Sequence, residues 1–354
     1  MTDKEITFLD SLYKMYNESE YNFDALNNKK IFLSKPSAFN DPFDCFVAMD
    51  EKKFICLYMA KKLKEIDAPE NIIVDVKSGD ISIIRYAESF NTMSKLFNVN
   101  EIEKITGLEQ DIIKKMNYEK WLKESKDLLQ KYRDKINEIR NSFYIACFTK
   151  NRPTGNMVMW SHYANNYKGL CAEFNFGNIK YDLGKERIDK RGYKILKHMH
   201  YVTYSRNFIK LDTDTLFNTP IDKLTENKKI ISAIKRSLCK KHEQWKYEKE
   251  IRLVLTEKDL RSIGDYKILQ NGCLLYFPYL RRLFIHKRIN NYTIKPAVEN
   301  LAKKLDIKYC ILKDSNGAIV FEEDDEINDH NLLIDMKNMG LGHDNNDNIP
   351  DIPF

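Results

Sequence analysis

Two glutamates and an arginine stand at alternate positions in residues 245–255, WKYEKEIRLVL. The pattern predicts a strand over about 248–256, because alternate residues of a strand share one face. Glu248, Glu250 and Arg252 would then project from one face, while the apolar residues between them enter the core. A carboxylate beside the anomeric carbon of a sugar stabilises an oxocarbenium ion, which is the chemistry of glycosidases. The alternative interpretation is a solvated Glu–Arg ladder of little energetic consequence.

Basic and aromatic residues precede this row. The triplet KKH at 240–242 supplies Lys241 as a candidate contact for a phosphate, and Trp245 offers a planar surface to a ligand. Of the two acids we predict Glu250 as the first catalytic candidate and Glu248 as the second. The neighbouring arginine is expected to position them rather than to react.

A second aromatic group lies in residues 159–169, MWSHYANNYKG. The spacing predicts a helix over 159–168 that ends at a glycine. Trp160 and Tyr163 would share one helical face, and either could stack on a base or a nicotinamide with His162 as a hydrogen-bond donor. The alternative is an aromatic packing stripe inside the core.

The segment FNDPFD at 39–44 has the composition of a turn that leads into a helix. Asp41 suits the N-cap, and Asp44 stands at the third helical position, as in a capping box. The functional alternative is that a strand edge delivers Ser34, Asn40 and Asp41 to a ligand. Capping by itself accounts for the local residue types, but it does not exclude a ligand contact, so both interpretations stay open.

Charge is distributed unevenly along the 354 residues, which carry a net charge of +6. Residues 301–354 hold five lysines and twelve acidic side chains, a net of −7, so the first 300 residues carry +13. A basic body with an acidic end suits an anionic partner such as nucleic acid or a phosphorylated ligand. A Lys-rich surface without such a partner is the alternative.

Cysteine spacing and hydropathy indicate the cellular compartment in which the protein is expected. The seven cysteines include no C-x-x-C pair, which favours buried thiols over disulfides or a zinc site. No apolar run is long enough to span a bilayer, so no membrane partner is expected. The first residues lack the order of a signal peptide, and we therefore expect a cytoplasmic protein. Nothing in the sequence indicates an oligomeric state.

Hydrophobic periodicity predicts an α+β fold with a central, mostly antiparallel sheet and flanking helices. Strands are expected at 31–34, 143–149, 170–175, 200–204, 248–256, 283–285, 308–312 and 318–322, and helices at 221–244 and 294–305. Residues 1–50 and 142–322 would form a single domain, interrupted by a helical insertion at 51–141. The acidic, Asn-rich residues 323–354 are expected to be disordered.

Three blocks together resemble the bacterial family known as domain of unknown function 2971. They are FLSKPSAFNDPFDC (32–45), ACFTKNRPTGNMVMWSHYANNYKGLCAEF (146–174) and KHEQWKYEKEIRLVL (241–255). The resemblance covers about residues 15–260, apart from the helical insertion. The family name implies no activity.

The order of a basic strand residue, a strand serine and a late E-x-E also resembles the Arg–Ser–Glu layout of ADP-ribosyltransferases. This resemblance implies that Lys14 contacts the phosphates of NAD, at a position where that family has Arg or His. Ser34 would support the site, Glu250 would hold the nicotinamide ribose, and Glu248 would orient the acceptor. The expected activity is transfer of ADP-ribose from NAD to a macromolecule, with nucleic acid as the candidate acceptor, in a toxin or phage-defence effector.

Two other classes of function remain open. The first is a Mg²⁺-dependent nuclease or phosphodiesterase in which Lys241 stabilises the leaving charge. Its metal ligands would be Asp41, Asp44, Glu248 and Glu250. The second is a non-catalytic module that grips a ligand or nucleic acid with its aromatic side chains. Those side chains would be Trp160, Tyr163 and Trp245.

Overall fold

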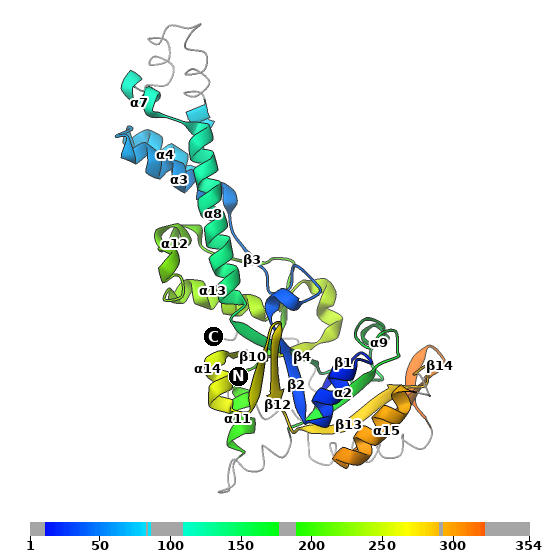
Figure 1. The fold of residues 1–354 in the computed structure, drawn as a ribbon. Coiled ribbons are helices and arrows are strands. Elements are labelled where there is room, and N and C mark those ends of the chain that lie inside the picture. Colours follow the sequence, from blue (N-terminus) through cyan, green and yellow to red (C-terminus); the bar gives the residue numbers. More distant parts are fainter. Residues whose placement is uncertain (1–10, 83, 86–108, 177–188, 290–292, 323–354) are drawn as a thin grey trace, which may run out of the picture. The chain divides into compact units, whose positions relative to one another are not determined.

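The fold is mixed α+β, built around an eleven-stranded sheet that is mostly antiparallel, which confirms the predicted class (Figure 1). The computed structural model describes residues 11–82, 84–85, 109–176, 189–289 and 293–322. The chain divides into two compact units, each of which is described by itself. Unit 1 comprises residues 1–45, 141–207 and 238–354, and unit 2 comprises residues 46–140 and 208–237.

Unit 1 contains the large sheet. Its main path runs β11 (Tyr266–Leu269), β12 (Gly272–Tyr276), β2 (Lys30–Ser34), β4 (Phe143–Thr149), β1 (Ser11–Tyr16), β5 (Leu170–Asn175), β13 (Leu280–His286), β14 (Lys308–Ser315) and β15 (Ala318–Phe321). Strand β10 (Glu250–Thr256) pairs with β4 along its length and with β6 (Met199–Tyr201) on its other side. Within this sheet only the β13–β14 pair of the described strands is parallel. Two short strands, β7 (Thr203–Tyr204) and β9 (Lys240–Lys241), pair beside it.

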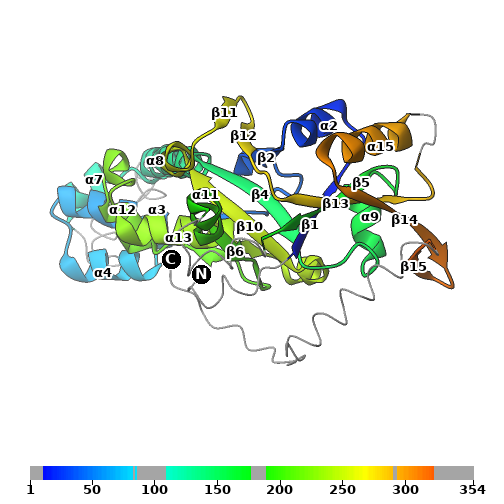
Figure 2. The same cartoon turned by 90° about the horizontal axis from the view of Figure 1, so that it is seen from below.

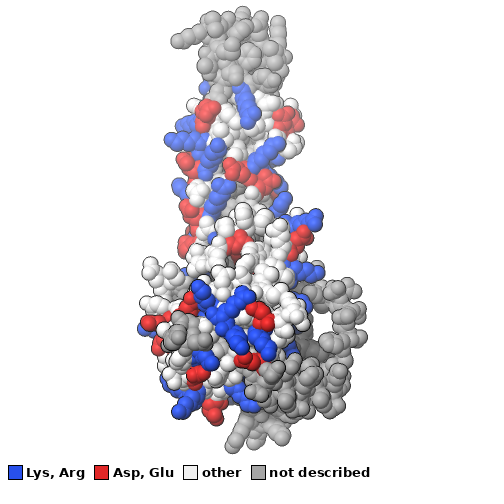
Figure 3. Space-filling view, turned by 90° about the vertical axis from the view of Figure 1, so that its right-hand side faces the viewer, with Lys and Arg blue, Asp and Glu red and all other residues white. Residues whose placement is uncertain are grey.

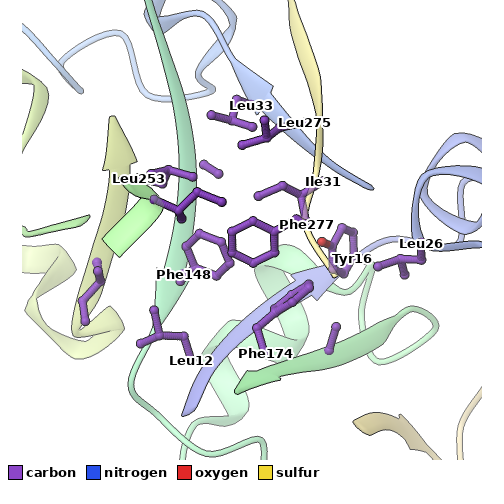
Figure 4. Close-up of a cluster of buried hydrophobic side chains, with 14 of the residues drawn as sticks. Leu12, Tyr16, Leu26, Ile31, Leu33, Phe148, Phe174, Leu253, Leu275 and Phe277 are labelled. Atoms are coloured by element: carbon purple, nitrogen blue, oxygen red, sulfur yellow. The ribbon is translucent and has the colours of Figure 1, made fainter. Parts of the chain in front are cut away.

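One face of the sheet carries the main hydrophobic core. Ile251, Leu253 and Leu255 of β10 all project into it and are fully buried, as the alternation of the sequence predicts. Phenylalanine rings from neighbouring segments, among them Phe148 and Phe174, meet in the middle of this core (Figure 4). Burying each such large side chain contributes roughly 1.5–3 kcal/mol, so this face dominates the stability of unit 1.

Four helices cover that face. They are α2 (Glu20–Asn27), α11 (Lys190–Lys197), α14 (Glu257–Ile263) and α15 (Ile294–Leu305), and each contributes buried apolar residues to the core. Helices α2 and α15 lie side by side, whereas α9 (Met157–Tyr163) lies on the other face (Figure 2). Glu250 and Arg252, which alternate with the core residues of β10, therefore project from the opposite face.

Helix α9 is shorter than the predicted 159–168. It is followed by three consecutive residues with positive φ, 165–167, and then by Gly169. A Cβ at Gly169 would lie 2.0 Å from the carbonyl oxygen of Tyr16, so only glycine lets β5 begin against β1. The predicted glycine stop is thus required by close approach of two backbones.

Unit 2 is mainly helical. Its elements are α3 (Glu51–Glu65), α4 (Glu70–Ser78), α7 (Gln110–Lys115), α8 (Tyr118–Arg140), α12 (Thr213–Asn218), η3 (Ile221–Lys223), most of α13 (Lys228–Leu238) and the parallel pair β3 (Val47–Ala48) with β8 (Ile209–Lys210). Helices α3, α4 and α8 pack around a core that includes Met59, Ile73 and Trp121. The unit includes residues 208–237, which the sequence placed in the sheet domain.

Further predicted elements differ from the structure. The helix expected at 221–244 breaks up, because α13 ends at Leu238 and is followed by β9 and by the 3₁₀ helix η4 (Glu243–Glu248). The strand expected from residue 248 begins at Glu250, since Lys249 adopts a left-handed conformation with φ of 44°. Glu248 therefore does not belong to the strand.

The remaining predictions concern the segment 39–44, the C-terminal residues and membrane-spanning helices. No helix starts at Asp41; its carboxylate instead accepts a hydrogen bond from the backbone of Phe43 in a turn, so the capping interpretation was wrong. The predicted disordered tail at 323–354 lies outside the described residues. Within the part of the chain that the structure describes, no helix is long and apolar enough to cross a membrane.

Candidate functional site

A buried guanidinium organises the charged face of unit 1. Arg252 has no solvent exposure, and its Nε donates to Glu250 Oε1 at 2.7 Å. Its Nη1 and Nη2 donate to the two carboxylate oxygens of Asp44, each at 2.8 Å. Nη1 also donates to the carbonyl oxygen of Leu238 at 2.7 Å, and Nη2 to Glu250 Oε2 at 3.2 Å. Because these bonds lie along two edges of the planar guanidinium, Arg252 fixes the carboxylates of both Glu250 and Asp44.

Lys241 adds a second cation to this cluster. Its Nζ donates to Glu248 Oε2 at 2.6 Å and to Glu250 Oε2 at 3.3 Å, and it lies 3.8 Å from Asp44 Oδ2. The Trp245 ring covers the same ammonium, with its centroid 4.8 Å from Nζ. The ammonium thus bridges two glutamates that come from different elements, η4 and β10. We call Asp44, Lys241, Glu248, Glu250 and Arg252 the charged cluster.

The two glutamates have opposite pKa shifts. Burial by itself would raise the pKa of Glu250, but Arg252 and Lys241 outweigh burial and lower that pKa to about 2. Burial raises the pKa of Glu248 above its usual value, and Lys241 only partly offsets this, while the negative charge of Glu250 adds to the increase. Glu250 is therefore fixed as a carboxylate, whereas Glu248 is the member of the pair that can take up a proton.

Four aromatic side chains lie above the cluster and are exposed or half-buried. His162 and Tyr163 come from α9, and Trp245 and Tyr247 from η4. The Tyr247 hydroxyl lies 3.3 Å from His162 Nδ1, and the Trp245 ring centroid is 6.3 Å from the imidazole and 6.0 Å from the Tyr247 ring. The Tyr163 hydroxyl donates to Glu248 Oε1 at 2.5 Å. These four residues, here called the aromatic patch, connect solvent to the charged cluster.

Side-chain hydrogen bonds hold η4 against the loop that follows β4. Asn151 and Asn156 both donate through Nδ2 to the Tyr247 carbonyl oxygen, at 2.6 and 2.9 Å. The Thr149 hydroxyl donates to the Glu248 carbonyl oxygen at 2.5 Å. Asn156 also caps α9 by accepting from the Met159 backbone. The loop and the helix therefore position the two halves of the patch together.

Several predicted residues meet at this site. The structure brings together His162, Tyr163, Lys241, Trp245, Glu248, Glu250 and Arg252. Trp160 does not join them, because it is fully buried and donates through Nε1 to the Pro153 carbonyl oxygen at 2.6 Å. The expectation that Trp160 stacks on a ligand was therefore wrong.

Lys14 lies on the opposite face of the sheet. On β1 it alternates with Tyr13 and shares its face with Leu12 and Tyr16, which belong to the main core. Its Nζ donates to the Cys147 carbonyl oxygen at 3.2 Å. It does not share the face of Glu250, so the position implied by the Arg–Ser–Glu layout is corrected.

The other implied ligand contacts lie apart from the charged cluster. Ser34 pairs with Ile145, which also pairs with Val254, so Ser34 lies on the correct face but level with Val254 rather than with Glu250. Asn40 is exposed beside the turn formed by Asp41. Neither Asn40 nor Asp41 approaches the glutamates through any contact recorded among the described residues.

Sequence reasoning missed two contributors and one pairing. Asp44 was assigned to a capping box or, in the nuclease alternative, to a metal site with the two glutamates, and its pairing with Arg252 was not predicted. Tyr247 was visible in the motif WKYE but was not assigned to the site. The hydroxyl of Tyr204 accepts from the Glu250 backbone N–H at 2.8 Å, and no local signal pointed to this contact.

The carboxylates do not form a metal site. Among the described residues, no group of three or more His, Cys, Asp or Glu side chains is placed to hold a metal ion. The ammonium of Lys241 and the guanidinium of Arg252 lie between Asp44 and the two glutamates, where a cation would otherwise bind. The donor set thus does not fit the Mg²⁺ site expected for a nuclease.

The segment from α9 to the middle of β10 matches a protein-family model. Residues 159–253 are a DUF2971 family domain, described as a protein of unknown function. This DUF2971 domain contains the whole aromatic patch and all of the charged cluster except Asp44. No curated protein and no solved structure matches the chain, so the comparisons give no support to the resemblance to ADP-ribosyltransferases.

Proposed function

We propose that the DUF2971 domain binds a nicotinamide nucleotide of the NAD class on the aromatic patch and transfers its ADP-ribose group to an acceptor. One observation carries this proposal: two carboxylates with opposite pKa shifts lie directly beneath an aromatic surface that solvent reaches. Aromatic rings bind a planar heterocycle, and a carboxylate stabilises the positive charge that develops on the sugar.

Glu248 is the better candidate for contact with the substrate. The charge of Glu250 is neutralised by both Arg252 and Lys241, whereas Glu248 pairs with Lys241 alone and bonds to Tyr163 of the patch. This proposal reverses the order in which the sequence ranked the two acids. Glu250 then acts as a positioning residue that keeps Lys241 charged, and Arg252 holds the carboxylate of Glu250 in place.

The proposed reaction breaks the bond between the ribose anomeric carbon and the nicotinamide nitrogen. The electron pair of that bond leaves with nicotinamide, and the carboxylate of Glu248 stabilises the cationic carbon. An acceptor hydroxyl then forms the new bond to this carbon and gives its proton to Glu248, whose raised pKa suits a general base. The products are ADP-ribosylated acceptor, nicotinamide and a proton.

The proposed acceptor is a macromolecule, with nucleic acid as the first candidate. Lysine and arginine side chains gather on one face of the sheet-bearing unit, with acidic side chains among them (Figure 3). Such a surface attracts phosphate backbones without selecting a sequence. In a toxin or phage-defence effector, expression of the wild-type chain would arrest bacterial growth, and expression of an inactive variant would not.

Nicotinamide release by the purified full-length chain tests this function. The assay uses NAD with DNA, RNA and protein acceptors, and it compares wild type with Glu248→Gln and Glu250→Gln. Glu257→Gln, at an exposed glutamate of α14, is the matched control. We expect Glu248→Gln to lose at least about 100-fold in rate, typical of a lost general base, with the control unchanged. Absence of release with every acceptor refutes the proposal.

Non-catalytic binding is the second candidate function, because Glu248 and Glu250 are only 2% and 5% exposed. A domain of this kind would hold a ligand on the aromatic patch, and the charged cluster would serve as a rigid support beneath it. It predicts that NAD raises the melting temperature without nicotinamide release, and that Trp245→Ala removes the shift while Glu248→Gln keeps it. Turnover that depends on Glu248 excludes this candidate.

A further inference from the structure

Three exposed lysines border the aromatic patch. Lys150 directly follows β4, Lys246 belongs to η4, and Lys249 directly follows η4. Their backbones lie together, because the Lys150 N–H donates to the Lys249 carbonyl oxygen and the Lys249 N–H donates to that of Lys246, each at 3.3 Å. Lys246 stands between the two aromatic residues of η4 in the sequence. We call these three lysines the basic rim.

The basic rim has no acidic partner. Among the described residues, no carboxylate forms an ion pair with any of its three ammonium groups. Glu243 of η4 pairs instead with the exposed Arg206, and Glu248 is buried and bonds to Lys241. The rim therefore presents three positive charges to a ligand from solvent.

The aromatic patch supplies flat surfaces beside these charges. The Trp245 and Tyr247 rings are tilted by 41° to each other, and the Trp245 ring meets the His162 imidazole edge-on at 66°. These rings therefore do not stack face to face on one another, and their faces can meet a ligand. Proteins that bind single-stranded nucleic acid combine such rings, on which bases stack, with basic side chains that follow the phosphates.

We propose that the basic rim and the aromatic patch together bind single-stranded nucleic acid. The phosphates would lie on the three lysines, and an unpaired base would stack on Tyr247 or His162. The Trp245 ring, which covers Lys241, remains for the nicotinamide of the proposed reaction. The role of the strand as acceptor rests on the proposed function, whereas its binding does not.

The chemistry of the surface selects single strands over duplexes. Bases in a duplex stack on one another, so their faces are not available to a protein ring, whereas unpaired bases can turn outward. Stacking does not distinguish one base from another, because every base has a flat face. The surface should therefore bind a strand with little preference for its sequence.

Fluorescence anisotropy with the full-length chain and no NAD tests the proposal. The probe is a labelled oligothymidylate of about 12 nucleotides, within the range of site sizes of single-strand binders. We expect it to bind at least about tenfold more tightly than a duplex of the same length, because one or two stacked bases give that factor. An oligouridylate shows whether the 2′-hydroxyl contributes, and binding of either strand supports the proposal. Absence of binding at low salt, or a duplex that binds equally well or better, overturns it.

Two matched triple variants test the basic rim. The first combines Lys150→Gln, Lys246→Gln and Lys249→Gln. It should weaken binding and reduce the salt slope of the binding constant by about 2, because each phosphate contact on a single strand contributes about 0.7. The control removes the same charge from exposed lysines elsewhere in unit 1, by Lys258→Gln, Lys267→Gln and Lys303→Gln. Equal weakening by both triple variants overturns the proposal, because the affinity would then follow net charge alone.

A single variant tests the stacking. Tyr247→Ala removes the ring but keeps the backbone carbonyl oxygen that Asn151 and Asn156 hold. It should weaken binding of the single strand at least about fivefold. An unchanged affinity in a chain with unchanged circular dichroism overturns the role of the ring.

The outcomes separate this inference from the proposed function. Strand binding without nicotinamide release refutes the transfer reaction and leaves the binding surface standing. Nicotinamide release by a chain that does not bind the strand refutes the binding surface alone.

Discussion

Replacing Arg252 by methionine should destabilise unit 1 strongly. The change fills similar volume but removes the guanidinium that bonds to Asp44, Glu250 and the Leu238 carbonyl oxygen. Two buried carboxylates would then depend on Lys241 alone. Removing one partner of a buried ion pair costs about 3–5 kcal/mol, because the remaining charge is left uncompensated. We expect a loss of this size in the free energy of unfolding.

Tryptophan fluorescence during urea unfolding measures this loss. Trp121 lies in unit 2, whereas Trp160 and Trp245 lie in unit 1, so a Trp121→Phe background reports on unit 1. The matched control is Arg261→Met, which breaks an exposed pair with Glu257 and should cost no more than about 1 kcal/mol. A loss below about 1 kcal/mol for Arg252→Met would show that Arg252 does not stabilise the buried carboxylates.

The Arg252→Met variant should also change how the free energy of unfolding depends on pH in acid. The folded pKa of Glu250 is about 2, below its value in an unfolded chain. Its contribution is therefore complete above the unfolded pKa of about 4.3 and is lost as pH falls from there toward 2. Without Arg252 the folded pKa should rise, so the variant should lose less stability than wild type over that interval. Equal losses in both proteins contradict this account of the pKa.

Three further outcomes are expected. Gly169→Ala should lower the free energy of unfolding in urea by about 1–3 kcal/mol, because its Cβ would lie 2.0 Å from the Tyr16 carbonyl oxygen. An unchanged midpoint would show that β1 can shift without cost. Leu253→Ala should lower the same free energy by about 2–5 kcal/mol, since loss of this fully buried side chain leaves a cavity. An unchanged free energy of unfolding would contradict its place in the core. The rate of nicotinamide release should rise with pH through the raised pKa of Glu248, because a general base must be unprotonated; a rate that falls over this range excludes that role.

Local pattern predicted much of the sheet. The apolar alternation of 251–255 correctly assigned Ile251 and Leu253 to the core face and Arg252 to the other face. Alternation works here because β10 is flanked by strands on both sides and keeps a regular pleat. It failed at Glu248, because the left-handed Lys249 separates this residue from the start of the strand. A left-handed non-glycine residue has no reliable signature in the sequence.

Local sequence pattern was enough to predict the α+β class, the strand positions of Glu250 and Arg252, and the DUF2971 domain over residues 159–253. Which charged side chains meet depends on the three-dimensional fold. Asp44 reaches Arg252 across 208 positions of sequence, and Lys14 falls on the face opposite Glu250 although both stand on strands of one sheet. Side-chain periodicity is a local property, whereas strand register and the long connections between strands determine which side chains share a face of the sheet. The row, for which a solvated ladder was one of two interpretations, is a buried cluster beneath an aromatic surface.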